Sequence, residues 1–367
     1  MTDKEYMQMA LKLAEKGSGY TSPNPLVGAV IVKHGKVIGS GYHERCGESH
    51  AERNALAGCE EPTDGATLYV TLEPCCHYGR TPPCTEAIIA SGISRVVVGT
   101  IDPNPLIGGK GIRILDDHGI EVTSGVLQKE CDRLNAVFFH FIRYKMPYVI
   151  MKYAMTMDGK IAAGNGESKW ITGEAARENV HRDRHRYSGI MVGVGTVIKD
   201  NPSLDCRLED GNNPIRIICD TNLRTPADAR VVTTAKEIPT ILVTAIQDEK
   251  QHAVYLKSGC EVLVIPTAEG RINLKQLMVR LGEKEIDSIF LEGGSTLNWS
   301  ALESGIVHRV QAYIAPKLFG GSAAISPIGG QGVPCPNQAI KLVETEVKQF
   351  GEDLLLESEV EYVHGNY

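Results

Sequence analysis

Ser49-His50-Ala51-Glu52, then Glu73-Pro74-Cys75-Cys76 and then Cys84 are the residues that decide the fold of the first part of the chain. Residues 50–56 have a helical pattern, residues 66–72 form a strand-like run, and residues 84–90 are again helical. The polar motifs therefore fall at the ends of predicted elements. Strands that alternate with helices are typical of a layered α/β domain.

The side chains of this stretch are of the types that hold a catalytic zinc ion. Such a site keeps three nitrogen or sulfur ligands and a fourth position for water, whose pKa falls from about 15.7 towards about 7. A carboxylate two residues after the zinc histidine can carry a proton from that water to a ring nitrogen and a leaving amine. His50 and Glu52 have this spacing. The pattern predicts hydrolytic deamination of a nucleobase-like ring.

The second cysteine departs from the general pattern of zinc deaminases, P-C-x-x-C. Position 78 is a tyrosine, and Cys84 follows only after the insert 76–83. Cys76 and His77 lie inside this insert and compete with Cys84 as possible ligands. A purely structural zinc ion is a further alternative, although Glu52 would then have no task.

The remaining sequence extends the alternation on both sides. Residues 128–144 are predicted as one connecting helix that stops near Pro147, and the boundary near residue 145 divides the chain into domains 1–145 and 146–367. In the first domain, helices are also predicted at 2–16 and 111–118, and strands at 26–32, 36–40 and 95–99. In the second, strands are predicted at 148–154, 189–194, 214–219, 239–243, 262–265, 288–291 and 308–315, and helices at 173–186, 273–281 and 295–303.

Composition argues against several classes of protein. The chain of 367 residues has a formal net charge of −7 and no basic stripe, which argues against a nucleic-acid partner. It has no apolar run of about 18 residues, so no membrane span is predicted. The N-terminus does not have the pattern of a signal peptide. The ten cysteines are therefore predicted to be reduced thiols of a cytoplasmic protein.

The insert Cys76-His77-Tyr78-Gly79-Arg80-Thr81-Pro82-Pro83 carries a resemblance to a known family. Together with Pro23–Val30 and Asp102-Pro103-Asn104-Pro105, it resembles the deaminase half of the bifunctional riboflavin-biosynthesis deaminase–reductases. The resemblance covers residues 1–145 and implies a cytidine-deaminase-like three-layer domain. It implies His50, Cys75 and Cys84 as zinc ligands, Asn24 and His43 as contacts of the substrate ring, and Arg80, Thr81, Asp102 and Asn104 as contacts of its sugar and phosphate. A plain turn at 23–25 and a solvated loop charge at Arg80 are the alternatives.

The second half has two glycine clusters after apolar strands, at 191–196 and 290–297, and no G-x-G-x-x-G fingerprint. The second cluster has the order strand, glycine turn, helix start, which presents backbone N–H groups to a phosphate. Glycine turns end many strands, so either cluster alone is a weak signal.

Three longer motifs, at 152–162, 168–173 and 195–204, resemble the reductase half of the same family. The resemblance implies a dihydrofolate-reductase-like α/β fold that uses NADPH. It implies NADPH contacts at Ala154, Trp170, Thr196, Asp200 and Gly294, and substrate contacts at Ser168, Arg184, Leu204, Arg207 and Glu292. Arg184 and Arg207 suit a phosphate, and the alternative for both is a charge on the protein surface. The alternative for Trp170 is packing in the core. The proton donor stays open between Lys152 and water.

The two resemblances together imply one bifunctional enzyme of riboflavin biosynthesis. It would deaminate 2,5-diamino-6-ribosylamino-4(3H)-pyrimidinone 5′-phosphate and then reduce the ribosyl chain with NADPH. The family also implies a homo-oligomer, a dimer or a tetramer. The competing hypotheses are a deaminase that edits nucleic acid, which predicts a basic groove, and a non-enzymatic zinc-stabilised scaffold, which leaves Glu52 without a role.

Overall fold

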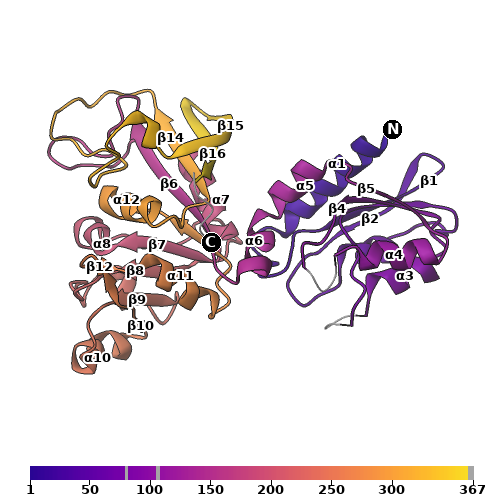
Figure 1. The fold of residues 1–367 in the computed structure, drawn as a ribbon, viewed down its shortest axis with the longest axis horizontal. Helices are drawn as coiled ribbons and strands as arrows, with labels where there is room; N and C mark the ends of the chain where they lie inside the picture. Colours follow the sequence, from indigo (N-terminus) through magenta and orange to yellow (C-terminus); the bar gives the residue numbers. More distant parts are fainter. Residues whose placement is uncertain (79–81, 105–107, 363–367) are drawn as a thin grey trace. The chain divides into compact units, whose positions relative to one another are not determined.

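The computed structural model describes residues 1–78, 82–104 and 108–362. The chain divides into two compact units, Met1–Lys145 and Met146–Tyr367. Each unit has its own sheet (Figure 1). No helix among the described residues is both long enough and apolar enough to cross a membrane.

The first unit is built on a five-stranded sheet with the strand order β2-β1-β3-β4-β5. β1 runs antiparallel to both β2 and β3, while β3, β4 and β5 run parallel. The parallel part carries the carboxyl ends of β3 and β4 to the same edge of the sheet. The strands are β1 (Gly28–Lys33), β2 (Lys36–Tyr42), β3 (Thr67–Leu72), β4 (Arg95–Thr100) and β5 (Glu121–Ser124).

Helices cover both faces of this sheet, which confirms the predicted three-layer arrangement. Within β1, Ala29 and Ile31 pack with α2, α3 and α4, whereas Val30 and Val32 pack with α1 and α5 on the opposite face. This is the two-residue alternation of a strand that is buried on both sides. In Figure 1, α1 and α5 lie together over one face. The helices are α1 (Asp3–Ala14), α2 (Ala51–Ala57), α3 (Cys84–Ala90), α4 (Lys110–Asp117) and α5 (Gln128–Leu134).

The predicted single helix at 128–144 is wrong. It is two helices, α5 and α6 (Ala136–Tyr144), which meet at Asn135. The buried Asn135 amide accepts a hydrogen bond from the Leu26 N–H at 2.8 Å and donates one to the Leu26 carbonyl at 2.9 Å. Because these partners lie 109 residues earlier in the chain, no local pattern announces the break. The short polar strand β5 was also missed.

The second unit is built on a nine-stranded sheet with the order β10-β9-β8-β7-β13-β6-β14-β16-β15. The first seven strands in this order, which end with β14, run parallel to one another. β16 and β15 form an antiparallel hairpin at the edge of the sheet next to β14. The parallel strands are β6 (Tyr148–Thr156), β7 (Gly189–Gly193), β8 (Ile215–Cys219), β9 (Thr240–Thr244), β10 (Glu261–Val264), β13 (Ser288–Leu291) and β14 (Arg309–Ala315). A separate small ribbon pairs β11 (Thr267–Ala268) with β12 (Arg271–Ile272).

Apolar side chains cover both faces of the parallel strands. α11 (Leu274–Gly282) and α12 (Ser295–Glu303) pack on one face with Val149, Met191 and Ile289. Ile190, Val192 and Ile218 lie in a second cluster with α8 (Val194–Asp200), α9 (Arg230–Thr233) and α10 (Glu249–Ser258). α7 (Glu174–Arg186) precedes β7. The alternating α/β organisation predicted for this half is confirmed.

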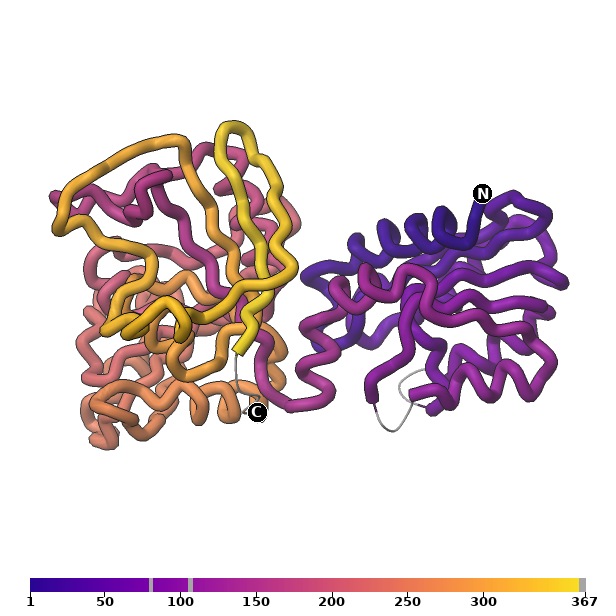
Figure 2. Tube along the Cα trace, turned by 45° about the horizontal axis from the view of Figure 1, so that its top comes forward, coloured from indigo at the N-terminus to yellow at the C-terminus, as the bar shows by residue number. Residues whose placement is uncertain are grey.

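The elements missed in the second unit share a weak apolar pattern. α8 begins between two glycines, Gly193 and Gly195, so it was assigned to a glycine cluster. α9 has only four residues, and α10 mixes charged and apolar positions. β15 (Lys341–Phe350) is exposed along nearly its whole length and pairs with β16 (Asp353–Glu361). The yellow end of the tube in Figure 2 is this hairpin.

Candidate active sites

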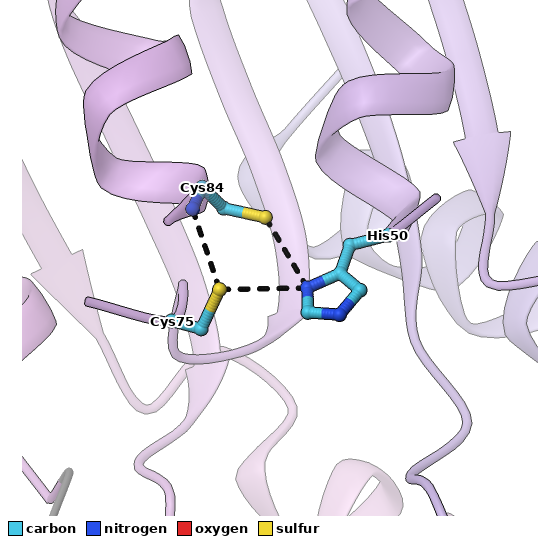
Figure 3. Close-up of side chains that lie close together, drawn as sticks. All are labelled: His50, Cys75 and Cys84. Carbon is cyan, nitrogen blue, oxygen red and sulfur yellow. Dashed lines mark hydrogen bonds between the residues drawn. The ribbon is translucent and has the colours of Figure 1, made fainter. Parts of the chain in front are cut away.

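His50, Cys75 and Cys84 meet in the first unit (Figure 3). The Nδ1 atom of His50 lies 3.4 Å from the Cys75 sulfur and 3.4 Å from the Cys84 sulfur. Among the described residues, this is the one cluster of three metal-binding side chains, with all three donor atoms within 4.8 Å of one another. The structure therefore gathers three of the residues singled out in the sequence.

The positions of the three residues follow from the elements that carry them. His50 is the extended residue that caps α2, Cys75 follows the end of β3, and Cys84 opens α3. The backbone N–H of Cys84 donates a hydrogen bond to the Cys75 sulfur at 3.3 Å. Free N–H groups at a helix start stabilise a thiolate. This hydrogen bond therefore favours the thiolate of Cys75 and holds it beside Cys84.

The cluster fits a zinc ion. With zinc–nitrogen bonds of ~2.0–2.1 Å and zinc–sulfur bonds of ~2.3 Å, tetrahedral angles place the nitrogen about 3.6 Å from each sulfur. The two observed distances of 3.4 Å agree with this value. Three ligands leave one tetrahedral position for water. Cys76 and His77 are outside the described cluster, and His77 is exposed.

The two sulfurs influence each other's protonation because they lie close together. The hydrogen bond with Cys84 and that with His50 lower the pKa of Cys75 to about 4. The same bond to Cys75, together with burial, raises the pKa of Cys84. Cys84 therefore keeps its proton while Cys75 ionises, because two adjacent thiolates would repel each other. A divalent cation between them removes that repulsion and lets both ionise.

Glu52 lies beside this cluster and is only 3% exposed. Burial, and then the nearby Cys75, raise the pKa of Glu52 to about 7. Its carboxyl group also shares a hydrogen bond with the Cys84 thiol. A carboxyl group with a pKa near neutrality can both take up and release a proton at pH 7. This is the property that a proton shuttle requires.

His43 lies beside His50 and is joined to Asn24 by a hydrogen bond. His43 Nδ1 lies 3.1 Å from the Ser49 carbonyl oxygen, and because a carbonyl only accepts, Nδ1 carries the proton. His43 Nε2 then accepts from Asn24 Nδ2 at 3.2 Å. Burial lowers the pKa of His43 and keeps the ring neutral. The His43 ring also meets the His50 ring edge-on, with centroids 5.5 Å apart.

The loop after β4 carries the other predicted contacts of this unit. Asp102 is 8% exposed, and its Oδ1 accepts from the Asn104 N–H at 2.8 Å. Burial raises the pKa of Asp102. Arg80 and Thr81, predicted to contact the sugar and phosphate, lie outside the described residues.

Two cavities in the second unit collect all ten residues predicted for the reductase. The first, of about 880 Å³, is lined by Ala154, Ser168, Trp170, Arg184, Asp200, Leu204, Arg207 and Glu292. The second, of about 630 Å³, is lined by Ser168, Thr196, Asp200, Glu292 and Gly294. Because Ser168, Asp200 and Glu292 line both, the two cavities are continuous at these side chains. Trp170 is 61% exposed with the Arg177 guanidinium 4.7 Å from its ring centroid, so core packing does not explain it.

Glu292 holds two cations at the junction of the cavities. Arg184 Nε and Nη2 donate to its two oxygens at 2.7 and 3.2 Å, and Lys152 Nζ lies 3.5 Å from Oε2. Burial opposes the charge of Glu292, but Arg184 and Lys152 outweigh burial and lower its pKa to about 2. Arg184 Nη1 also donates to the Asp205 carbonyl at 2.9 Å. The predicted bidentate contact of Arg184 is therefore made to a carboxylate of the protein.

The 630 Å³ cavity is lined by the glycine turn at the start of α12 and by cations that no sequence motif revealed. Gly293 and Gly294 lead from β13 into the first turn of α12, and both line the cavity. A side chain at Gly293 would collide with Asn298 Oδ1 at 2.5 Å. The cavity is also lined by Lys199, Arg224 and Arg271. Single cations in a short helix, a loop and a two-residue strand have no periodicity, so only the fold collects them.

A buried arginine, Arg216, supports the loop that carries Leu204. It is 0% exposed and donates to the Ser203 carbonyl at 3.1 Å, as well as to Thr234 and Thr240. Leu204 has a positive φ of 53° and is 3% exposed. Such a backbone persists in a branched residue only where its surroundings hold it. Arg216 is therefore part of the scaffold of the 880 Å³ cavity.

Two family models match the chain, one in each unit. Residues 1–100 match the cytidine and deoxycytidylate deaminase zinc-binding region, and residues 147–356 match the RibD C-terminal domain. The cluster of His50, Cys75 and Cys84 lies inside the first match, and both cavities lie inside the second.

Similar proteins match over the whole chain. The riboflavin biosynthesis protein RibD of Actinobacillus pleuropneumoniae is 55% identical, over 97% of this chain and 95% of its own length. That of Aquifex aeolicus is 46% identical, over 96% and 97%. The solved structure of Acinetobacter baumannii RibD superimposes with a TM-score of 0.86 at 36% identity, over 98% and 99%. The Thermotoga maritima diaminohydroxyphosphoribosylaminopyrimidine deaminase/5-amino-6-(5-phosphoribosylamino)uracil reductase gives 0.84 at 38% identity, over 98% of both chains.

Proposed function

The chain belongs to the RibD family of bifunctional riboflavin-biosynthesis enzymes, and on that premise we propose the substrate and the role of each site residue. The enzyme is a zinc-dependent deaminase joined to an NADPH-dependent reductase. We infer that the first unit hydrolyses 2,5-diamino-6-ribosylamino-4(3H)-pyrimidinone 5′-phosphate and releases ammonia. The second unit then reduces the ribosyl chain to give 5-amino-6-ribitylaminouracil 5′-phosphate. The observation that carries the proposal is the buried Glu52 beside the cluster of His50, Cys75 and Cys84.

In the deaminase site, His50, Cys75 and Cys84 hold zinc, which supplies an acidified water as the nucleophile. Glu52 takes one proton from the attacking water and gives it to the ring nitrogen. It then takes the second proton from the oxygen that has added to the ring and gives it to the amine, which leaves as ammonia when its bond to the ring carbon breaks. Asn24 and His43 contact the substrate ring, and the hydrogen bond between them holds the two side chains in place. Asp102 and Asn104, with Arg80 and Thr81, bind the sugar and phosphate.

In the reductase site, bound NADPH would supply a hydride to the carbonyl carbon of the open ribosyl chain, and Lys152 or water would supply the proton to the carbonyl oxygen. The turn at Gly294 and the start of α12 bind its phosphates through backbone N–H groups, and Ala154, Trp170, Thr196 and Asp200 complete its site. Ser168, Arg184, Leu204, Arg207 and Glu292 bind the substrate. Glu292 holds Lys152 and Arg184 at the junction of the two cavities, where cofactor and substrate must meet.

The proposal is tested with the purified protein and the diaminopyrimidinone phosphate. Ammonia release should require zinc and should not require NADPH. NADPH oxidation should begin only as the deaminated product forms, and it should be immediate when that product is supplied. NADPH oxidation on the undeaminated substrate at the same rate would contradict the assigned order of the two steps.

We propose that Arg224 and Arg271 read the 2′-phosphate that distinguishes NADPH from NADH. Both line the 630 Å³ cavity that contains the glycine turn, and arginine suits phosphate through paired hydrogen bonds. Loss of one charge-assisted contact costs about 1.5–3 kcal/mol, which is roughly a 10- to 150-fold rise in KM. R224Q and R271Q should each raise the KM for NADPH and leave the KM for NADH unchanged. K275Q, which alters a charge on α11, is the matched control.

Two other outcomes would count against this assignment. An equal rise of the KM for both cofactors would show that the arginines contact a group that NADPH and NADH have in common. No change with either cofactor would show that neither side chain contacts the 2′-phosphate.

We propose that the chain forms a homo-oligomer through the edge strand β15. This strand is the last in the sheet order and exposes Leu342 and Val347, at 48% and 62%. An unpaired, partly apolar edge of this length favours association with another strand. Sedimentation should give at least twice the mass of the chain, and V347D should reduce it. A wild-type monomer at micromolar concentration would contradict this proposal.

We also propose that the enzyme acts in the cytoplasm on free phosphorylated pyrimidines, without a nucleic-acid partner. The net charge of −7 opposes binding of a polyanion. A gel-shift assay at low salt should give no retarded RNA or DNA. Salt-sensitive binding would favour the editing hypothesis instead, and fractionation of cells checks the location.

A further inference from the structure

Glu73, two residues before Cys75 in the chain, is a buried carboxylate whose partners are backbone N–H groups. It is 4% exposed. Its Oε2 accepts from the N–H of Asp102 at 3.2 Å and of Gly109 at 2.9 Å. Its Oε1 accepts from the N–H of Gly111 at 2.9 Å and of Ile112 at 3.3 Å. One side chain thus serves four amides of a distant segment.

The four amides lie at the two ends of the loop between β4 and α4. Asp102 is the second residue after β4, whereas Gly109 is the N-cap of α4 and Gly111 and Ile112 lie in its first turn. Glu73 therefore ties the beginning of the loop to its end. The same carboxylate takes the place of a capping side chain, because Gly109 has none.

The close approach of the two segments is built into the sequence. A side chain at Gly111 would place its Cβ 2.2 Å from the Pro74 carbonyl oxygen and 3.2 Å from Glu73 Oε1. Gly109 has a positive φ of 76°, a conformation that favours glycine. The β3–α3 connection that carries Cys75 and the loop that carries Asp102 are thereby locked together.

We propose that Glu73 is a positioning residue of the deaminase, which holds Asp102 and Asn104 in place for the sugar and phosphate of the substrate. Asp102 is fixed at its N–H by Glu73, and it in turn fixes Asn104, whose N–H donates to Asp102 Oδ1. The chain of contacts leads from a buried carboxylate, whose oxygens accept from four backbone amides, to the two residues that are proposed to bind the sugar and phosphate. This inference rests on the proposed role of Asp102 and Asn104.

The test compares E73Q with D102A in the full-length, zinc-loaded enzyme. A glutamine keeps the size of the side chain but replaces one acceptor oxygen with an NH₂ group, so two of the four amides lose their acceptor. E73Q should raise the KM of ammonia release at least about tenfold and change kcat less than about threefold, because a remote binding contact is lost. Zinc content and the reductase rate on deaminated product should not change. E61Q, which removes an exposed charge from the ion pair with Lys36, is the matched control.

Amide hydrogen exchange gives a readout that does not depend on turnover. In E73Q, faster exchange should be confined to the amides of Asp102, Gly109, Gly111 and Ile112. Faster exchange throughout the first unit, or a parallel fall in zinc content and kcat, would show a general structural role and overturn the inference. If D102A raises the KM and E73Q does not, the inference on Glu73 alone fails. If neither variant raises it, the proposed role of the loop fails first and the inference with it.

Discussion

Replacing Glu52 with glutamine is expected to lower the rate of ammonia release by about 10²- to 10⁴-fold, the contribution of a positioned proton-transfer group. Glu52 is buried beside the zinc-binding cluster, and burial raises its pKa to about 7. The amide of glutamine has nearly the same shape but cannot take up a proton and pass it on. Because Glu52 is not assigned as a ligand, zinc content should stay at the wild-type level.

The two activities of the chain provide the control for this variant. E52Q should oxidise NADPH at the wild-type rate when the deaminated product is supplied, because Glu52 lies in the other unit. E130Q, which removes an exposed carboxylate of α5, should keep both activities. Wild-type ammonia release by E52Q would refute the shuttle role. Loss of zinc together with activity would make Glu52 a structural residue.

The second large effect is expected from C84S, set beside C76S. The Cys84 sulfur lies 3.4 Å from His50 Nδ1, at the start of α3. Serine offers a hydroxyl group that stays protonated at neutral pH and binds zinc poorly. C84S should therefore retain less than about a tenth of the wild-type zinc and lose ammonia release in proportion.

C76S should retain both the metal and the activity, because Cys76 is outside the described cluster. Both variants replace one sulfur atom with oxygen, at Cys76 in the connection after β3 and at Cys84 in the first turn of α3. Metal analysis after removal of loosely bound ions measures the difference directly. Full zinc in C84S with loss in C76S would reverse the ligand assignment, and loss in neither would exclude both sulfurs as necessary ligands.

The elements and residues that could be predicted are those with a local signal. The helix predicted at 2–16 is present as α1, and Thr2 and Glu5 at its start form both hydrogen bonds of a capping box. The sequence predicted that His50, Glu52 and Cys75 would lie close together. The signals were the two-residue spacing of His50 and Glu52 and the strand that ends before Cys75. Cys84 required the resemblance, because its distance from Cys75 departs from the general pattern.

The contacts that could not be predicted join distant parts of the chain. Glu73 bonds to amides 29 to 39 residues away, and backbone groups leave no trace in residue types. Glu292 pairs with Arg184 across 108 residues, so no local pattern shows that this arginine also holds a carboxylate of the protein. Arg216 is buried and donates to carbonyl and hydroxyl oxygens. The sequence shows only an arginine within a strand and does not reveal that its side chain is buried.

The break at Asn135 and the hairpin of β15 and β16 were missed for opposite reasons. Asn135 interrupts a helical pattern through a bond to Leu26, which overrides local propensity. β15 is exposed along almost its whole length, so it lacks the one-sided apolar alternation by which an antiparallel strand is recognised.

Each of the two units has an apolar core of its own, so heat or a harmful substitution can inactivate one step and spare the other. The two steps act in series, so loss of either unit stops formation of the ribityl product. The compound that accumulates tells which unit has failed: the diamino compound if it is the first, and the deaminated compound with an unreduced ribosyl chain if it is the second. A heated sample should therefore lose ammonia release and NADPH oxidation at two separate temperatures, one for each core.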